Sequence, residues 1–188
     1  METSKKILAL DSSGLVASVA VVEGNSTYSN LLAEYTVNYK KTHSQTLLPM
    51  LDEIANMTEL DLTTIDAIAI AAGPGSFTGL RIGSATAKGL GLALKKPLIS
   101  IPTVDALAYN LYGTDRLICP IMDARRNQVY TGIYEFRGNT MEVLEPQMAV
   151  DIEVIAEKLC ERQQDVIFLG DGVPVFKDKL CNGLMDKL

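Results

Sequence analysis

The sequence has no tryptophan, a single histidine (His43), and no hydrophobic run long enough to cross a membrane. One histidine excludes a two-histidine metal site within the chain. Without tryptophan, an aromatic platform for stacked nucleic-acid bases is disfavoured. A membrane-spanning helix needs about 20 apolar residues, so we expect none. The sequence favours a globular protein that works with small molecules or other proteins.

Cysteine is also scarce. Cys119, Cys160 and Cys181 are odd in number and far apart in the sequence, which fits neither a disulfide framework nor a clustered zinc site. The residues before Asp11 include two lysines and a short apolar stretch, too short for a signal peptide. We therefore expect a reduced protein in the cytoplasm, not bound to a membrane.

Basic residues are the minority charge, with 17 lysines and arginines against 23 acids and a net charge of −6. A protein that binds nucleic acid alone is expected to carry a basic face, because neutralising phosphates drives that binding. The balance therefore argues against autonomous binding of RNA or DNA.

The 188 residues, 47% of them hydrophobic, suffice for one ordinary core or two small ones. Short apolar runs predict strands, and apolar residues at helical spacing predict helices. Thr42 and Gln45 have the spacing of a helix capping box. The first half is predicted to hold strands at 7–10, 15–22, 31–37, 65–72 and 98–101, with helices after 42 and at 77–94 and 104–111. The second half is predicted to hold strands at 117–122, 129–136, 141–144 and 166–169, with a helix at 152–160.

One order of elements occurs twice. Ile7–Glu23 aligns without gaps with Cys119–Glu135, so that Asp11 corresponds to Asp123. This repeat predicts two similar α/β domains around a cleft, the second cut short after Gly170. Chance similarity between short apolar strands is the alternative. Two glycine pairs that follow later strands also correspond: Gly73 and Gly75 with Gly170 and Gly172.

Five segments carry more specific motifs: Gly73–Gly83 (GPGSFTGLRIG), Leu8–Ser13 (LALDSS), Met122–Tyr130 (MDARRNQVY), His43–Ile54 (HSQTLLPMLDEI) and Phe168–Val173 (FLGDGV). Together they resemble the TsaB family of bacterial tRNA threonylcarbamoyladenosine biosynthesis, within the actin-like ATPase and sugar-kinase superfamily. The resemblance covers essentially the whole chain. It implies two tandem actin-like (ribonuclease H-like) α/β domains, residues 1–103 and 104–188, the second truncated.

The resemblance also implies a function. The chain is expected to be a non-catalytic scaffold that binds and activates the transferase TsaD, which modifies tRNA next to the anticodon. The ATPase TsaE is expected to bind the assembled pair. The chain alone is expected to form a homodimer through the same surface and to meet tRNA only indirectly. No cofactor of its own is expected, and ATP or ADP at the partner interface stays open.

Candidate nucleotide-binding residues come from the repeat. Both aspartates suit a nucleotide's magnesium, or else cap strand ends by bonding nearby backbone amides. The loop before the helix at 77–94 suits an anion, or else is a tight turn capped by Ser76 or Thr78. Neither aspartate is followed by a glycine-rich phosphate cradle, so we expect no hydrolytic site. The candidates are Asp11, Gly73, Gly75, Asp123, Gly170 and Gly172.

Partner-binding candidates lie on the two helices of the first half. Small residues recur every four positions from Gly79 to Gly91, which favours close approach of another backbone, either the chain's own sheet or a second protein. Arg81 occupies a first helical turn, where the dipole disfavours a cation. This placement indicates an outside anion, or else Arg81 is a solvated surface residue. Gly83→Leu or Ala87→Arg is expected to abolish the complex and retain the fold. The candidates are His43, Leu47, Leu51, Ile54, Arg81, Gly83, Ala87 and Gly91.

Two other functions stay open. One is a nucleotide-binding ATPase or kinase of the actin-like class, which magnesium-dependent ATP binding by the lone chain would favour. The other is a peptidase that uses His43 with Ser12, Ser44 or Ser76, although no nucleophile-elbow motif supports it. We predict no catalytic residue and no metal ligand.

Overall fold

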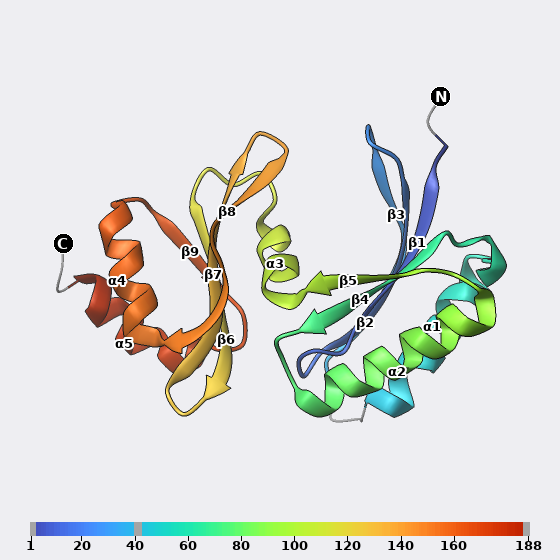
Figure 1. Cartoon of the computed structure of the whole chain (residues 1–188), viewed down its shortest axis with the longest axis horizontal. Coiled ribbons are helices and arrows are strands. Elements are labelled where there is room, and N and C mark those ends of the chain that lie inside the picture. The colour runs from blue at the N-terminus through green and yellow to red at the C-terminus, as the bar shows by residue number, and fades with distance from the viewer. Residues whose placement is uncertain (1–2, 40–42, 186–188) are drawn as a thin grey trace. The chain divides into compact units, whose positions relative to one another are not determined.

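The structure, a computed structural model, describes residues 3–39 and 43–185. The predicted cap at Thr42 lies outside these residues. The chain divides into two compact units, Met1–Ile101 (unit 1) and Pro102–Leu188 (unit 2), and each contains one mixed sheet with helices (Figure 1). The α/β class predicted from the sequence is confirmed. No helix within the described residues has the length and apolar composition needed to cross a membrane.

Unit 1 contains a five-stranded sheet of order β3-β2-β1-β4-β5. β1 pairs antiparallel with β2 and parallel with β4, which requires a crossover connection through a helix. Its elements are β1 (Lys5–Asp11), β2 (Ala17–Gly24), β3 (Ser29–Val37), α1 (His43–Met57), η1 (Leu62–Thr64), β4 (Ala67–Gly73), α2 (Phe77–Leu94) and β5 (Leu98–Pro102).

The core of unit 1 lies between one face of its sheet and the helices α1 and α2. Alternate residues of β1, such as Leu8 and Leu10, point to this face, as the two-residue period of a strand requires. Leu47, Leu51 and Ile54 of α1 pack against them. Both helices therefore turn their apolar stripes toward the sheet and their other sides away from it.

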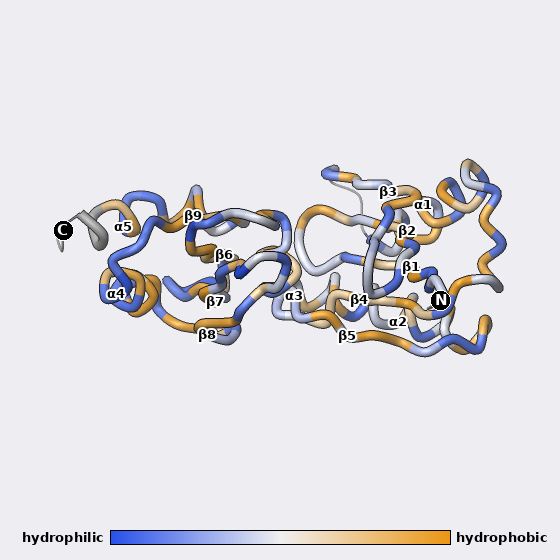
Figure 2. Tube along the Cα trace, turned by 90° about the horizontal axis from the view of Figure 1, so that it is seen from above, coloured by the Kyte–Doolittle hydropathy of each residue, from blue (hydrophilic) through white to orange (hydrophobic). Residues whose placement is uncertain are grey.

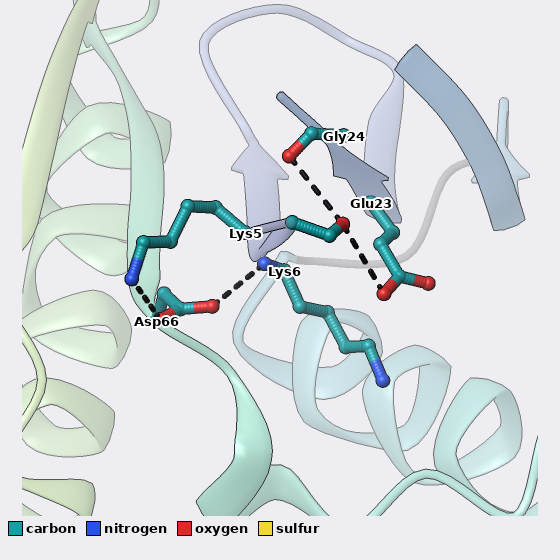
Figure 3. Close-up of polar contacts among 6 residues, drawn as sticks. Lys5, Lys6, Glu23, Gly24 and Asp66 are labelled. Carbon is teal, nitrogen blue, oxygen red and sulfur yellow. Dashed lines mark hydrogen bonds and ion pairs between the residues drawn. The ribbon is translucent and has the colours of Figure 1, made fainter. Parts of the chain in front are cut away.

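A polar clamp fixes the start of β1 beside β4 (Figure 3). Asp66 accepts the backbone N–H of Lys6 at 2.8 Å, and its other oxygen lies 3.0 Å from Lys5 Nζ. The bond from the Lys6 amide, helped by Lys5, lowers the pKa of the Asp66 carboxyl below its ordinary value. The clamp holds the parallel register that begins at Ile7 and Ala67.

Unit 2 contains a four-stranded sheet of order β8-β7-β6-β9, in which β6 and β9 are parallel. The order β–β–β–α–β–α of unit 1 recurs here. The predicted helix at 104–111 is shorter, and α5 was not predicted. The elements are α3 (Thr103–Ala108), η2 (Tyr109–Leu111), β6 (Leu117–Arg125), β7 (Gln128–Arg137), β8 (Thr140–Asp151), α4 (Ile152–Arg162), β9 (Val166–Leu169) and α5 (Val173–Met185).

Helices cover both faces of the unit 2 sheet. α4 and α5 contribute Ile155, Leu159 and Phe176 to the core on one face. On the other face, α3 contributes Val104 and Ala108. The alternation of hydrophobic and hydrophilic colour along α4 in Figure 2 shows its two sides, one buried and one solvated.

Candidate functional site

The turn between β1 and β2 lies directly on the start of α2. The carbonyl of Ser13 accepts the N–H of Ser76 at 2.6 Å, and the Ser12 hydroxyl donates to the Gly79 carbonyl at 2.9 Å. Ser12 and Ser13 are both buried by this contact. Asp11 holds the shape of the turn by accepting the N–H of Ser13 at 2.7 Å. The glycine-rich motif Gly73–Gly83 therefore packs against the β1–β2 turn.

The glycines of this motif make room for that turn. A Cβ atom at Gly75 would overlap the carbonyl oxygen of Ser13, and one at Gly79 would overlap that of Ser12. At Gly83 it would overlap the Ser12 hydroxyl. The close backbone approach predicted from the small-residue spacing is thus made by the chain itself.

His43 stands at the start of α1 and joins the same cluster. Its Nε2 lies 2.8 Å from the carbonyl oxygen of Gly14, so the imidazole bonds the backbone of the turn. Meanwhile the Ser12 hydroxyl bonds the Gly79 carbonyl, and the Ser76 hydroxyl accepts the Gly79 N–H at 3.3 Å. Neither serine is bonded to the histidine, so the geometry of a Ser–His nucleophile is not formed by these two residues.

Unit 2 has the corresponding aspartate and glycines in a similar arrangement. Asp123 accepts the N–H of Arg125 at 2.8 Å, as Asp11 does from Ser13. Gly172 donates its N–H to the carbonyl of Ile121 at 2.9 Å, and a Cβ at Gly170 would overlap that carbonyl. Both aspartates thus make the strand-end contact that was the alternative to magnesium binding. Within residues 3–39 and 43–185 no cluster of His, Cys, Asp or Glu is arranged to hold a metal ion.

The start of α2 was the candidate anion site. The Ser76 side chain caps the helix at the Gly79 N–H, and the Ser76 N–H is taken by the Ser13 carbonyl. The capped-turn alternative is therefore what the structure shows. The N–H groups of Ser76 and Gly79 are therefore engaged within the chain and are not available to an anion. Arg81 has an aromatic partner in the chain, since its guanidinium carbon lies 5.1 Å from the ring centre of Phe77.

The structure corrects the predicted partner surface. Ala87 is 0% exposed, so a partner protein cannot contact its side chain while unit 1 stays folded. Gly83→Leu and Ala87→Arg would therefore damage unit 1 itself, contrary to the expectation that they spare the fold. Arg81 is exposed and His43 is half-buried. The six predicted partner residues that lie buried in unit 1 are Leu47, Leu51, Ile54, Gly83, Ala87 and Gly91.

The exposed residues of these helices include Leu48, Asp52 and Glu53 of α1 and Phe77, Arg81, Lys88 and Leu92 of α2. These seven residues are here called the outer helix face. Phe77 is 74% exposed and Leu92 84%. Around Phe77, Arg81 and Lys88 the surface of α2 forms an open hollow of about 340 Å³. Helical spacing could have predicted the α2 part of this face. Residues 77, 81, 88 and 92 share a side of the helix that differs from the side of the buried small residues Gly79, Gly83, Ala87 and Gly91.

Charge divides the outer helix face. The α1 side carries Asp52 and Glu53, whereas α2 contains Arg81 and Lys88 and no acidic residue. Among the described residues, no ion pair involves a side chain of α1 or α2 (the pairs recorded are Lys5–Asp66 and contacts within unit 2). The outer helix face therefore combines exposed apolar side chains with charges that form no ion pair among the described residues.

Comparisons with known proteins decide the family. The model of the TsaD family, tRNA N6-adenosine threonylcarbamoyltransferase, matches residues 30–187. The tRNA threonylcarbamoyladenosine biosynthesis protein TsaB of Bacillus subtilis is 34% identical over 93% of this chain and 74% of its own length. TsaB of Escherichia coli is 30% identical over 92% of this chain and 74% of its own. The chain belongs to the TsaB family.

Solved structures agree with this assignment. YeaZ from Pseudomonas aeruginosa has a TM-score of 0.67 at 29% identity, over 79% of this chain and 68% of its own. A P. aeruginosa protein described as similar to the peptidase YeaZ has a TM-score of 0.71 at 26% identity, over 88% and 83%. The TsaB homologues place the chain in the biosynthesis of threonylcarbamoyladenosine on tRNA.

Proposed function

We propose that this TsaB-family chain is a non-catalytic scaffold that binds and activates TsaD in the modification of tRNA next to the anticodon. The observation that carries the proposal is the outer helix face. Phe77 and Leu92 are large apolar side chains that lie mostly in solvent, and exposed apolar patches mark interaction sites. TsaD is the favoured partner because the chain shares that family's sequence pattern and the TsaB family acts in the same modification.

The separation of acidic residues on α1 from basic residues on α2 is expected to set the orientation of a bound partner. A partner is expected to place acidic side chains opposite Arg81 and Lys88, and basic side chains opposite Asp52 and Glu53, because complementary charges orient an interface. A second copy related by a two-fold axis satisfies both conditions, since α1 of one copy then meets α2 of the other. This supports a homodimer when TsaD is absent, formed through the same residues.

The cluster at the start of α2 supports the non-catalytic part of the proposal. Its serines, glycines and histidine are engaged in holding the β1–β2 turn, and the proposal assigns them no chemistry. We propose no cofactor of the chain's own, TsaE bound to the TsaB–TsaD pair, and a cytoplasmic site of action. The tandem actin-like arrangement of the two units, with a shortened second domain, is part of the same proposal.

Replacing Phe77 and Leu92 together by aspartate tests the docking surface. Both substitutions replace exposed side chains outside the core, so the lone chain should keep its unfolding temperature. Binding to TsaD, measured by isothermal titration calorimetry, should weaken at least 100-fold, because two apolar anchors are lost and two charges become buried. Val175→Asp, a change of an exposed apolar helix residue in unit 2, is the matched control and should bind normally. Equal binding by both variants would place the interface elsewhere.

A further inference from the structure

The hairpin between β6 and β7 in unit 2 has a backbone conformation that its residues rarely adopt. Arg125, Arg126 and Asn127 have backbone φ angles of 69°, 53° and 66°. A two-residue hairpin turn of type I′ requires positive φ at both central positions, which glycine adopts freely and asparagine adopts more readily than other residues. Arginine adopts it only at an energetic cost. The pair Asn-Gly would make the same turn without this strain.

Side chains on both sides hold the turn in this shape. Asp123 accepts the N–H of Arg125 at 2.8 Å and lies 3.4 Å from its Nη1. Asn127 accepts from Lys179 of α5 and donates to Glu153 of α4 at 3.4 Å. Lys179 and Glu153 also pair at 3.0 Å. The backbone is thus fastened to the strand end and to two helices, which keeps the arginines in one place.

The guanidinium groups themselves remain accessible. The Arg125 side chain is 86% exposed, and Arg126 is exposed with no ion pair among the described residues. The corresponding residues of unit 1, Ser13, Gly14 and Leu15, carry no charge, and Ser13 is buried, whereas Leu15 is 79% exposed. Strained backbone beside exposed side chains is found often at binding sites, and it persists because the surrounding structure maintains it.

We infer that the 125–127 turn binds phosphate groups of the RNA backbone when the chain is assembled with TsaD. A guanidinium donates two parallel hydrogen bonds that match the oxygens of a phosphate. A turn already fixed in position loses little conformational freedom on binding. The inference rests on the proposed function, in which the RNA is a tRNA held mainly by TsaD, and it adds a direct contact where only an indirect one was expected.

Two sets of variants separate charge from strain. Arg125→Gln with Arg126→Gln removes both cations and leaves the turn. Arg126→Asn eases the strain at position 126 and removes one cation, and it keeps the bonds of Asn127 to Lys179 and Glu153. Arg116→Gln with Arg137→Gln is the matched control, since it removes two exposed cations from elsewhere in unit 2.

The probe is a labelled unmodified tRNA transcript, titrated with the purified TsaB–TsaD complex at several salt concentrations. The double glutamine variant should weaken binding about tenfold and reduce the slope of log affinity against log salt by about 1–2. The control should match the wild type. The Arg126→Asn variant should raise Tm by about 2 °C and weaken binding by a smaller factor than the double glutamine variant.

Complex formation is measured first, so the two ideas fail in different ways. If the wild-type chain forms no complex with TsaD, the proposed function is contradicted and this inference falls with it. If the complex forms but RNA affinity is unchanged in the double glutamine variant, only the inference is overturned. If that variant loses the complex itself, the turn contacts the protein partner, which also overturns the assignment to RNA.

Discussion

Units 1 and 2 share one order of strands and helices but have different surfaces. Unit 2 is bound together by ion pairs, such as those of Lys158 and Arg162 with Glu145. In the described part of unit 1, by contrast, the recorded pair is Lys5–Asp66. Its helix α2 exposes Phe77 at 74% and Leu92 at 84%, against 40% for Val154 of α4 and 62% for Val175 of α5 in unit 2. Figure 2 colours the chain by residue hydropathy, which varies along α4 and is largely hydrophobic along β5. A solvated surface suits a unit that faces water, and the surface of unit 1 suits a unit that is covered by a partner.

The first hairpin of each unit differs in the same way. In unit 1 the turn after Asp11 is buried against α2, and three glycines of α2 and its preceding loop admit it. In unit 2 the glycines of the β9–α5 loop approach the carbonyl of Ile121 instead, and the turn itself projects with its arginines exposed. The β1–β2 turn therefore contributes buried residues to the packing of unit 1, whereas the equivalent β6–β7 turn of unit 2 exposes its side chains.

The largest effect is expected where a glycine admits the buried turn. Gly79→Ala places a methyl group against the Ser12 carbonyl and should lower the free energy of unfolding by about 3 kcal/mol or more. Gly89→Ala, on the same helix with open space around it, should raise that free energy by about 1 kcal/mol. Urea unfolding measures both. Equal effects would mean that helix propensity, not the turn, explains the glycines.

A smaller effect is expected on the stability of unit 2 at alkaline pH. Burial raises the pKa of the Cys119 thiol in unit 2 from 9.0 to about 12. The unfolded chain loses this proton above about pH 9 while the folded chain keeps it, so stability is full below pH 9 and falls as the pH rises toward 12, by about 1.4 kcal/mol per pH unit. Burial and the bond to Asp105 raise the pKa of Tyr134 and add a loss of the same sign above pH 10.

Urea unfolding under reducing conditions from pH 8 to pH 11 measures this slope. Cys119→Ser keeps a hydroxyl at the position of the hydrogen bond to Thr131, which is 3.3 Å long, and should flatten the slope. Cys181→Ser changes an exposed cysteine and should behave as the wild type. A slope that Cys119→Ser leaves unchanged would show that the alkaline loss does not come from the buried thiol.

Much of the fold could be predicted from the sequence, because short apolar runs between turn residues identify strands without knowledge of their neighbours. The predicted helix at 77–94 matches α2, and the strand at 166–169 matches β9. The gap-free alignment of the two aspartates also anticipated their shared backbone contact. These features depend on residues close together in the chain, which a sequence displays directly.

The candidate site was harder to predict, because burial depends on what lies across the fold. The apolar residues Leu47 and Leu51 suit a partner surface or a core equally well, and only the packing of α1 on the sheet distinguishes the two. α5 was missed because Pro174 and Gly183 interrupt its pattern, although a proline near the start of a helix is tolerated. Positive φ at two arginines contradicts residue preference and has no signal in the sequence.

The central claim is that this chain acts through the outer helix face and performs no chemistry. The direct test is threonylcarbamoyl transfer to tRNA by matching TsaD, TsaE and the synthase that supplies the activated threonylcarbamoyl group. The account predicts transfer with the wild-type chain and with Val175→Asp, and none without the chain or with Phe77→Asp/Leu92→Asp. Full transfer with that double variant, or without any added chain, would contradict it.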